Sequence, residues 1–292
     1  MSDPLILSEA IRQFFIAKQA ERLSPSTFAD YGNTFKQFRK YIGDPYIQDI
    51  TPAHVREFLA SLTHLAKKTV VNYWTGLSSL WTWAYNDGIV SDHVMRKVKK
   101  PRTDRKAVKP FSDDDIQKIF SCKHKKYPLR NKAILYILLD TGIRCSELCD
   151  AQVEDYKGRT LTVWGKGDKE RIVPLSALTM NAIDDYLQHE RPDPNEGNPL
   201  IVSDRGEQFT RSGIYQMLYK MGPRTGVRKI YTHRFRHTFA VSFLRNGGDV
   251  FSLQEILGHT TLEMTRRYVK LARLDIQKTH ERASPITCLH LS

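Results

Sequence analysis

The chain has 292 residues, of which 40% are hydrophobic and 26% are charged, and its 45 Lys and Arg outnumber 32 Asp and Glu to give a formal net charge of +13. This length favours two domains over one, and the absence of an apolar run of about 18 residues argues against a membrane span. Residues Met1–Ile6 lack the basic stretch and long apolar core of a signal peptide, so we expect a cytoplasmic protein with a polyanionic partner.

Amphipathic helices fill the first predicted domain, residues 1–94. Ser8 is the expected N-cap of the first helix, and Ser24 followed by Pro25 is a strong start signal for the second. The aromatic residues of this region are typical of a buried core, which predicts a compact helical bundle. The expected helices run over Ile6–Arg22, Ser24–Gly43, Thr51–Leu62 and Lys67–Gly88.

A basic segment, residues 95–110, is predicted to be an extended linker between the two domains. Its single acid is Asp104, and prolines lie at Pro101 and Pro110. The composition fits either a strap across a nucleic-acid phosphate backbone or a solvated hinge without a ligand. The basic residues singled out as candidate DNA contacts are Lys97, Lys99, Lys100, Arg102, Arg105 and Lys106.

The second predicted domain, residues 111–282, mixes helices with one β-hairpin and is followed by a tail, residues 283–292. Ser112 is an expected N-cap, and the change to alternating spacing predicts a hairpin from Thr160–Trp164 and Arg171–Pro174. The fold class predicted for the chain is therefore mainly α with a small β-hairpin (α+β). Helices of this domain are expected over Arg130–Asp140, Ala177–Arg191, Thr210–Met221, Thr232–Asn246, Ser252–Leu257, Thr261–Ala272 and Leu274–Arg282.

Two of the four cysteines, Cys145 and Cys149, would share a helix face. Such a pair fits either zinc ligation or buried thiols. No second pair of ligands lies at metal-site spacing, so buried thiols are favoured and no metal site is expected.

Polar residues cluster in short motifs of the second domain. Arg144 lies in a tight turn after a helix, where an arginine is most often a helix-dipole or salt-bridge partner. His233 and Arg236 are spaced i, i+3 on one face near a helix N-terminus, where the helix dipole also favours a phosphate. Tyr268 lies two turns into the last strongly predicted helix, where a tyrosine is usually part of the core.

In combination, these motifs resemble the tyrosine recombinase, or phage integrase, family. The resemblance extends over almost the whole second domain, from T-G-I-R-C-S-E-L through G-K-G-D-K-E-R-I-V-P-L, H-R-F-R-H and L-G-H to R-R-Y, in matching order and spacing. The first domain is similar, more loosely, to the helical core-DNA-binding bundle that precedes the catalytic domain in this family. Few residues precede this bundle, so an additional arm-binding module is not expected.

The resemblance implies a catalytic role for each polar residue of the motifs. Arg144 and Arg236 would hold the scissile phosphate, and His259 would hydrogen-bond one of its oxygens. Tyr268 would attack phosphorus with the assistance of His233 in proton transfer, which leaves a 3′-phosphotyrosyl link and a free 5′-hydroxyl. The sequence leaves open whether the Tyr268 hydroxyl reaches the phosphate before the protein assembles on DNA.

The resemblance also implies a general acid and a supporting carboxylate. Lys166, in the G-K-G turn of the hairpin, would protonate the departing 5′-oxygen, and Lys169 is the alternative for that role. Glu147 would support the arginine site by hydrogen bonding. The covalent link retains the energy of the phosphodiester, so the reaction requires no cofactor, metal ion or ATP.

The partners implied are double-stranded DNA with a specific recombination site, a homotetramer on two duplexes that exchanges strands through a Holliday junction, and an accessory DNA-bending protein. Two other functions remain open from the sequence: a type IB topoisomerase-like enzyme, which swivels one strand, and a non-catalytic DNA-binding regulator on the same fold. The DNA target and the biological outcome, whether integration, excision, resolution or inversion, cannot be derived from the sequence.

Overall fold

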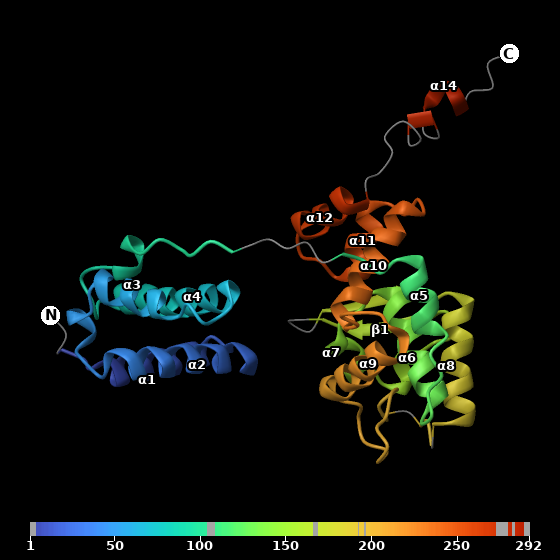
Figure 1. Ribbon diagram of the computed structural model, residues 1–292, viewed down its shortest axis with the longest axis horizontal. Coiled ribbons are helices and arrows are strands. Elements are labelled where there is room, and N and C mark those ends of the chain that lie inside the picture. The colour runs from blue at the N-terminus through green and yellow to red at the C-terminus, as the bar shows by residue number, and fades with distance from the viewer. Residues whose placement is uncertain are drawn as a thin grey trace. The chain divides into compact units, whose positions relative to one another are not determined.

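The computed structural model describes residues 4–103, 109–165, 169–191, 193–195, 197–272, 280–281 and 284–288 (Figure 1). The chain divides into two compact units, Met1–Lys106 and Ala107–Ser292, and each has its own hydrophobic core. No helix within the described ranges is long and apolar enough to cross a membrane.

The N-terminal unit is a bundle of four helices, in which α4 packs against the other three. Its core is aromatic: the rings of Phe14 and Phe35 meet edge to face with centroids 5.4 Å apart, and Trp81 is fully buried. Of the aromatic residues read from α2 as core, Phe35 and Phe38 fill the centre of the bundle, Phe28 and Tyr31 are half-buried, and Tyr41 is exposed at the end of the helix. The helices are α1 (Leu7–Ala20), α2 (Pro25–Ile42), α3 (Pro52–Ser61) and α4 (Lys67–Asn86), with 3-10 turns at Ile47–Asp49 and Val94–Lys97.

The starts of α1 and α2 show where local sequence signals hold and where they fail. Ser24 Oγ accepts a hydrogen bond from the backbone N–H of Thr27 at 3.4 Å, as the cap signal predicted. Ser8 is not the cap of α1, because the helix already begins at Leu7. Instead, the backbone N–H of Ser8 donates to Asp44 Oδ1 at 2.7 Å, so a carboxylate that follows α2 satisfies the helix start.

The first residues of the segment predicted as an extended linker belong to the helical unit instead. Val94–Lys97 forms a 3-10 turn, and Met95 and Val98 are buried in the aromatic core. Trp74 Nε1 also donates to the carbonyl of Val98 at 3.0 Å. The linker prediction was wrong for these residues because the run of basic side chains obscured apolar residues at helical spacing; residues 104–108 lie outside the described part.

The C-terminal unit is mainly helical with one two-stranded sheet, and the predicted fold class is confirmed. The helix predicted over Leu274–Arg282 falls mostly on residues 274–279 and 282, which lie outside the described residues. The helices are α5 (Asp113–Phe120), α6 (Pro128–Thr141), α7 (Cys145–Asp150), α8 (Ala177–His189), α9 (Arg211–Thr225), α10 (Thr232–Arg245), α11 (Val250–Leu257), α12 (Leu262–Ala272) and α14 (Pro285–Cys288), with a 3-10 turn at Val153–Asp155.

The sheet is the predicted hairpin of β1 (Thr160–Trp164) and β2 (Glu170–Pro174). The strands pair antiparallel, from Thr160 opposite Pro174 to Trp164 opposite Glu170. The backbone N–H of Gly165 donates to the carbonyl of Lys169 at 2.8 Å and continues the pairing beyond the strands. Residues 166–168, which include Lys166, lie outside the described part.

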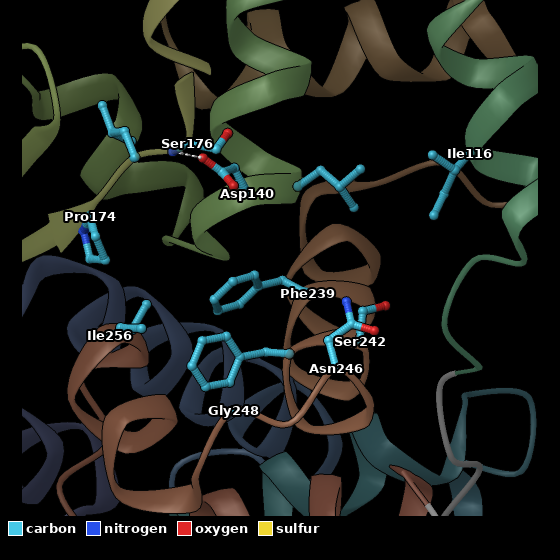
Figure 2. Close-up of a pocket in the computed structure, with 12 residues that line it drawn as sticks. Ile116, Asp140, Pro174, Ser176, Phe239, Ser242, Asn246, Gly248 and Ile256 are labelled. Atoms are coloured by element: carbon cyan, nitrogen blue, oxygen red, sulfur yellow. Dashed lines mark hydrogen bonds between the residues drawn. The ribbon is translucent and has the colours of Figure 1, made fainter. Parts of the chain in front are cut away.

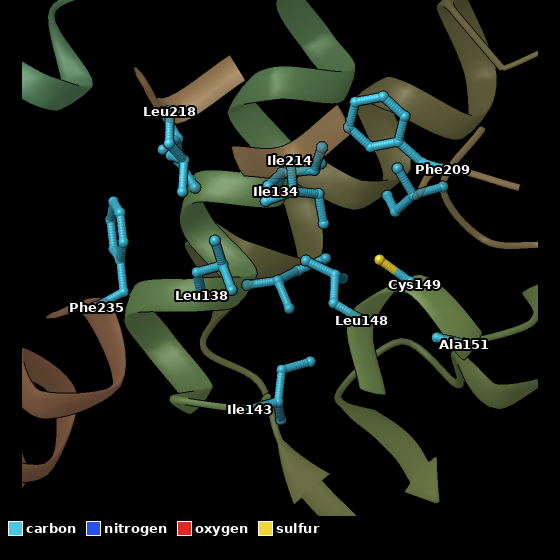
Figure 3. Packing of buried hydrophobic residues seen from close by; sticks show 14 of the residues in the cluster. Ile134, Leu138, Ile143, Leu148, Cys149, Ala151, Phe209, Ile214, Leu218 and Phe235 are labelled. Carbon is cyan, nitrogen blue, oxygen red and sulfur yellow. The ribbon is translucent and has the colours of Figure 1, made fainter. Parts of the chain in front are cut away.

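Helix α6 forms the centre of the C-terminal unit, packed against α8 and α10. Its apolar residues are buried on every side of the helix, as expected for a helix surrounded by others. Figure 3 shows Ile134 and Leu138 of α6 beside Leu148 of α7 and Ile214 of α9. A central, rigid α6 therefore fixes the position of the turn that follows it, from Gly142 to Arg144.

Candidate active site

The C-terminal ends of α6 and α11 both terminate in a glycine with left-handed backbone geometry. Gly142 has φ +60° and Gly258 has φ +61°. A Cβ on Gly142 would lie 2.5 Å from Phe239 Cδ1, and one on Gly258 would lie 2.9 Å from Arg171 Nη1. Both the backbone conformation and the lack of space therefore require glycine, and the turns leave main-chain carbonyls at each helix end available to arginine side chains.

Arg236, on α10, joins these two helix ends. Its Nη1 donates to the carbonyl of Gly142 at 2.8 Å, and its Nη2 donates to the carbonyl of Leu257 at 2.6 Å. The side chain is buried, and burial followed by repulsion from Arg144 lowers the pKa of Arg236 to about 10. The guanidinium therefore remains charged at neutral pH, and its orientation is fixed by the backbone.

Arg144 lies at the start of α7 and shares one buried carboxylate with a second arginine. Its Nη1 and its backbone N–H each donate to Glu147 at 2.7 Å, and its Nη2 donates to the carbonyl of Gly258 at 3.2 Å. Arg171, on β2, donates to both Glu147 oxygens, at 2.9 and 2.7 Å. Burial opposes ionisation of Glu147, but these hydrogen bonds and charges outweigh it and lower its pKa to about 2.

Tyr268, on α12, is fully buried in this structure. Its ring stacks on the ring of His259 with centroids 6.1 Å apart and planes 7° apart, and the His237 ring lies 5.3 Å away. Its hydroxyl accepts a hydrogen bond from Arg267 Nη2 at 2.8 Å. The Nδ1 of His259 lies 2.8 Å from Thr265 Oγ1, which fixes the imidazole against the tyrosine.

Three imidazoles have a lowered pKa: those of His237 and His259, which contact Tyr268, and that of His233, which contacts His237. Loss of hydration is the largest cause for each, and the nearby arginines, Arg267 and Arg236 among them, add to it. The pKa of His237 and of His259 falls to about 4, and that of the exposed His233 is lowered as well. These histidines are therefore predominantly neutral at pH 7, the form that can accept a proton.

We expect the free energy of unfolding to decrease as the pH is lowered from about 6.5 towards 4. His237 and His259 have a pKa of about 4 in the folded chain, against 6.5 for an unperturbed histidine. Between these values the unfolded state binds more protons, so the stabilisation is complete above about 6.5 and is lost on acidification. Each buried ring contributes on the order of 3 kcal/mol.

Urea denaturation of the wild type and of His237→Phe, at about pH 7 and about pH 5, measures this dependence. The variant is expected to lose less stability than the wild type between the two pH values. Identical losses in the two proteins would show that His237 is not buried in its neutral form.

A cavity of about 820 Å³ lies beside Arg144 and His259, whereas Arg236, His233 and Tyr268 are not among the residues that line it. Arg144, Arg171 and His259 line it, and so does Lys169 from the hairpin. The structure therefore places Lys169, one of the two candidate general acids, on the same cavity as Arg144 and Arg171. The cavity is wide enough for a sugar-phosphate unit, which suits an anionic substrate.

A second cavity, of about 600 Å³, lies between α5, α6, α10 and the end of β2 (Figure 2). Asp140 is the one titratable side chain among the described residues that line it, and its carboxylate accepts the backbone N–H of Ser176 at 2.8 Å. Phe239 and Ile256 contribute apolar surface. This cavity lacks the groups that phosphate chemistry requires, so the cavity beside Arg144 is the candidate active site.

The basic residues predicted to contact DNA are partly engaged in the N-terminal unit. Lys97 forms an ion pair with Asp92, and Lys100 Nζ lies 5.3 Å from the ring centroid of Trp74. Both amines are nevertheless on the surface, where a phosphate could replace these weak contacts. The other predicted contacts are the exposed Lys99 and Arg102 and, outside the described residues, Arg105 and Lys106.

The sequence assigned no role to Arg171, His237 or Arg267. Arg171 alternates along β2 with the exposed Ile172 and so shares the inner face with the buried Val173. A charged residue on the buried face of a strand signals a buried partner, so the alternation could have predicted an acidic partner for Arg171 without identifying it as Glu147. His237 follows His233 by one helical turn, so its place beside the same cluster could also have been predicted.

Two family models match the chain. The model of the phage integrase family matches residues 109–274, and the model of the phage integrase N-terminal SAM-like domain matches residues 11–89. The two matches fall within the two structural units.

Curated relatives and solved structures show the same likeness over most of the chain. A protein named tyrosine recombinase XerD from Listeria innocua is 32% identical over 228 residues, 75% of this chain and 76% of the relative. Tyrosine recombinase XerC from Pelobacter propionicus is 30% identical over 291 residues, 96% of each chain. The structure of a lambda integrase tetramer bound to a Holliday junction matches with a TM-score of 0.77 at 17% identity, over 91% of this chain and 78% of that chain, which shows a shared fold.

Proposed function

The chain belongs to the phage integrase family of tyrosine recombinases, and we propose that it recombines DNA at a specific site with Tyr268 as its nucleophile. This proposal rests on the contacts made by the segment Leu257–His259. The carbonyl of Leu257 binds Arg236, the carbonyl of Gly258 binds Arg144, and the ring of His259 stacks on Tyr268. This short turn therefore brings the guanidinium groups of Arg144 and Arg236 close to the proposed nucleophile.

In the proposed reaction, Tyr268 Oη attacks the scissile phosphorus and the bond from phosphorus to the 5′-oxygen breaks. Lys166 gives its proton to the departing 5′-oxygen, and Lys169, which lines the cavity, is the alternative donor. The tyrosine proton passes to His233, whose lowered pKa favours the neutral imidazole. Attack of a 5′-hydroxyl on the phosphotyrosine then reforms a phosphodiester without an external energy source.

The two arginines are proposed to stabilise the charge that builds on the phosphate oxygens during attack. Arg236 is already oriented by two main-chain carbonyls, and Arg144 by Glu147 and Gly258, so little reorganisation is needed when the phosphate binds. His259 would add a hydrogen bond from the imidazole edge that is not bound to Thr265.

The burial of Tyr268 and the hydrogen bond between its hydroxyl and Arg267 support the interpretation of this conformation as a state before cleavage. We propose that binding of DNA draws Arg267 towards a phosphate and frees the hydroxyl.

We propose that the partners are duplex DNA with a specific site and further copies of this chain, assembled as a tetramer on two duplexes. The likeness to a tetrameric integrase on a Holliday junction, over most of the chain, supports this arrangement. Strand exchange through a Holliday junction, the surface lysines and arginines as DNA contacts, an accessory DNA-bending protein and a cytoplasmic location stay predictions.

The test is a suicide duplex, in which a nick beside the cleavage position releases a short fragment and traps the covalent intermediate. The DNA site is first recovered by selecting duplexes that the intact protein binds from a randomised pool. We expect a protein–DNA adduct of the full chain, and mass spectrometry of its digest is expected to place the nucleotide on Tyr268. A protein that binds the selected duplex without forming an adduct would be a DNA-binding regulator, and the proposal would be wrong.

The same selected site separates recombination from topoisomerase activity. A recombinase is expected to join two duplexes that carry the site and to produce exchanged strands. Relaxation of supercoiled DNA without exchange between sites would instead indicate a type IB topoisomerase-like enzyme.

A further inference from the structure

We infer that Arg171 is a positioning residue that fixes the base of the β1–β2 hairpin against Glu147 and the end of α11. In this position, the lysine carried by the hairpin can protonate the leaving 5′-oxygen. This role rests on the proposed function, because it presupposes strand cleavage by Tyr268. Arg171 itself is not proposed to touch the phosphate.

The contacts of Arg171 tie the hairpin to two helices. Its Nη1 and Nη2 donate to the two oxygens of Glu147 on α7, and its Nε donates to the carbonyl of Ile256 on α11 at 2.8 Å. The Arg171 side chain is 13% exposed and that of Glu147 is 2% exposed. A bidentate ion pair with so little exposure to water is strongly oriented, unlike a pair on the surface.

The carboxylate of Glu147 serves two arginines at once. Its Oε1 accepts from the Nη1 atoms of both Arg144 and Arg171, and its Oε2 accepts from Arg171 Nη2 and from the backbone N–H of Arg144. One negative charge is thus shared between two guanidinium groups, which leaves a net positive charge for a phosphate. Arg144 keeps its two contacts with Glu147 and its contact with the carbonyl of Gly258 when Arg171 is replaced.

The glycine at the end of α11 allows this arrangement. A Cβ on Gly258 would lie 2.9 Å from Nη1 and 3.1 Å from Cζ of Arg171, so any other residue would displace the guanidinium. The carbonyl of Ile256 accepts a hydrogen bond from Arg171, and the carbonyl of the next residue, Leu257, accepts one from Arg236. Gly258 leaves the space that the Arg171 guanidinium occupies. The end of α11 therefore contacts both the hairpin and the two arginines that are proposed to bind the phosphate.

The place of Arg171 in the hairpin explains why its loss should affect the lysine most. It lies two residues from Lys169 and pairs across the sheet with Val163, next to the last pair of the two strands. Without Arg171, the strands are still held by the buried apolar residues Leu161, Val163 and Val173. Apolar packing keeps the base of the hairpin in the core, but it lacks the directional contacts of a bidentate ion pair. Arg236 keeps both of its carbonyl partners, because neither depends on Arg171.

The experiment compares two forms of the selected suicide duplex, one with an ordinary 5′-oxygen at the cleavage position and one with sulfur in its place. A thiolate leaves without a proton, so the sulfur duplex does not need a general acid. We expect Arg171→Met to cleave the ordinary duplex about 100-fold more slowly than the wild type, and to cleave the sulfur duplex within about threefold of the wild type. Arg171→Lys, which keeps the charge but not the bidentate contact, is expected to show a smaller loss with the same recovery.

Arg159→Met is the matched control, because Arg159 is an exposed arginine that directly precedes β1. It is expected to cleave both duplexes like the wild type. Lys166→Ala and Lys169→Ala identify the acid, since the variant that lacks it is expected to reproduce the pattern of Arg171→Met.

An equal loss on both duplexes in Arg171→Met, together with unchanged DNA binding, would show that Arg171 acts on phosphate binding or on the fold, and would overturn this inference alone. A wild-type protein that forms no adduct with either duplex would contradict the proposed function itself.

Discussion

Tyr268→Phe is expected to form no covalent adduct with the suicide duplex, at any time of incubation, while its fold and DNA binding are retained. The ring of Tyr268 stacks on His259 and lies beside His237, and a phenyl ring fills the same space. The substitution removes the hydroxyl and its hydrogen bond from Arg267, which costs about 1 kcal/mol of folding free energy. Gel analysis of the adduct and thermal denaturation measure the two effects separately.

Tyr219→Phe provides the matched control, because Tyr219 is 67% exposed on α9 and has no place in the cluster. It is expected to form the adduct at the wild-type rate. An undiminished adduct in Tyr268→Phe would assign the nucleophile to another residue and would refute the mechanism proposed for this chain.

Arg236→Ala is expected to reduce the rate of cleavage on the order of 10³-fold and to destabilise the protein as well. The guanidinium is proposed to stabilise the charge on the phosphate, and loss of one such preorganised donor typically costs a factor of 10² to 10³ in rate. The carbonyls of Gly142 and Leu257 would also lose their partner, at a cost of roughly 1–3 kcal/mol for each buried group. Single-turnover cleavage and urea denaturation give the two quantities.

Arg245→Ala is the comparison for Arg236→Ala, because Arg245 lies at the far end of the same helix and donates to the carbonyl of Ala272 instead. It is expected to retain cleavage within about threefold, since it lies outside the phosphate cluster. A folded Arg236→Ala protein that cleaved at the wild-type rate would remove Arg236 from the proposed chemistry and leave it a purely structural link between helices.

Local chemistry made part of the fold predictable. Ser24 with Pro25, the cap at Ser112 and the alternation in the hairpin depend on residues close in sequence, and the structure bears out each of them. The cap at Ser8 failed because the helix already begins at Leu7, where Asp44, distant along the chain, accepts the backbone N–H of Ser8. Charge alone also misled at Met95, where the apolar residues of a basic segment enter the core.

The sequence predicts which residues belong to the candidate site, but it does not predict the contacts that orient them. The motifs identify Arg144, Arg236 and Tyr268, yet no motif indicates that main-chain carbonyls orient the arginines. Arg171 was overlooked because its partner, Glu147, comes from a helix that precedes the hairpin, and an ion pair between distant segments has no local pattern. The burial of the tyrosine hydroxyl likewise depends on tertiary packing that only the structure gives.

The glycine ends of α6 and α11 make the lengths of these helices part of the proposed phosphate site. An α-helix turns by about 100° and rises by about 1.5 Å for each residue. Deletion of one residue within α6, even at a position remote from the cavity, would therefore rotate the carbonyl of Gly142 away from Arg236, and no change of side chain could restore it. Insertions and deletions in α6 and α11 should consequently be selected against more strongly than most substitutions there, because the length of each helix determines where the arginines proposed to bind the phosphate are held.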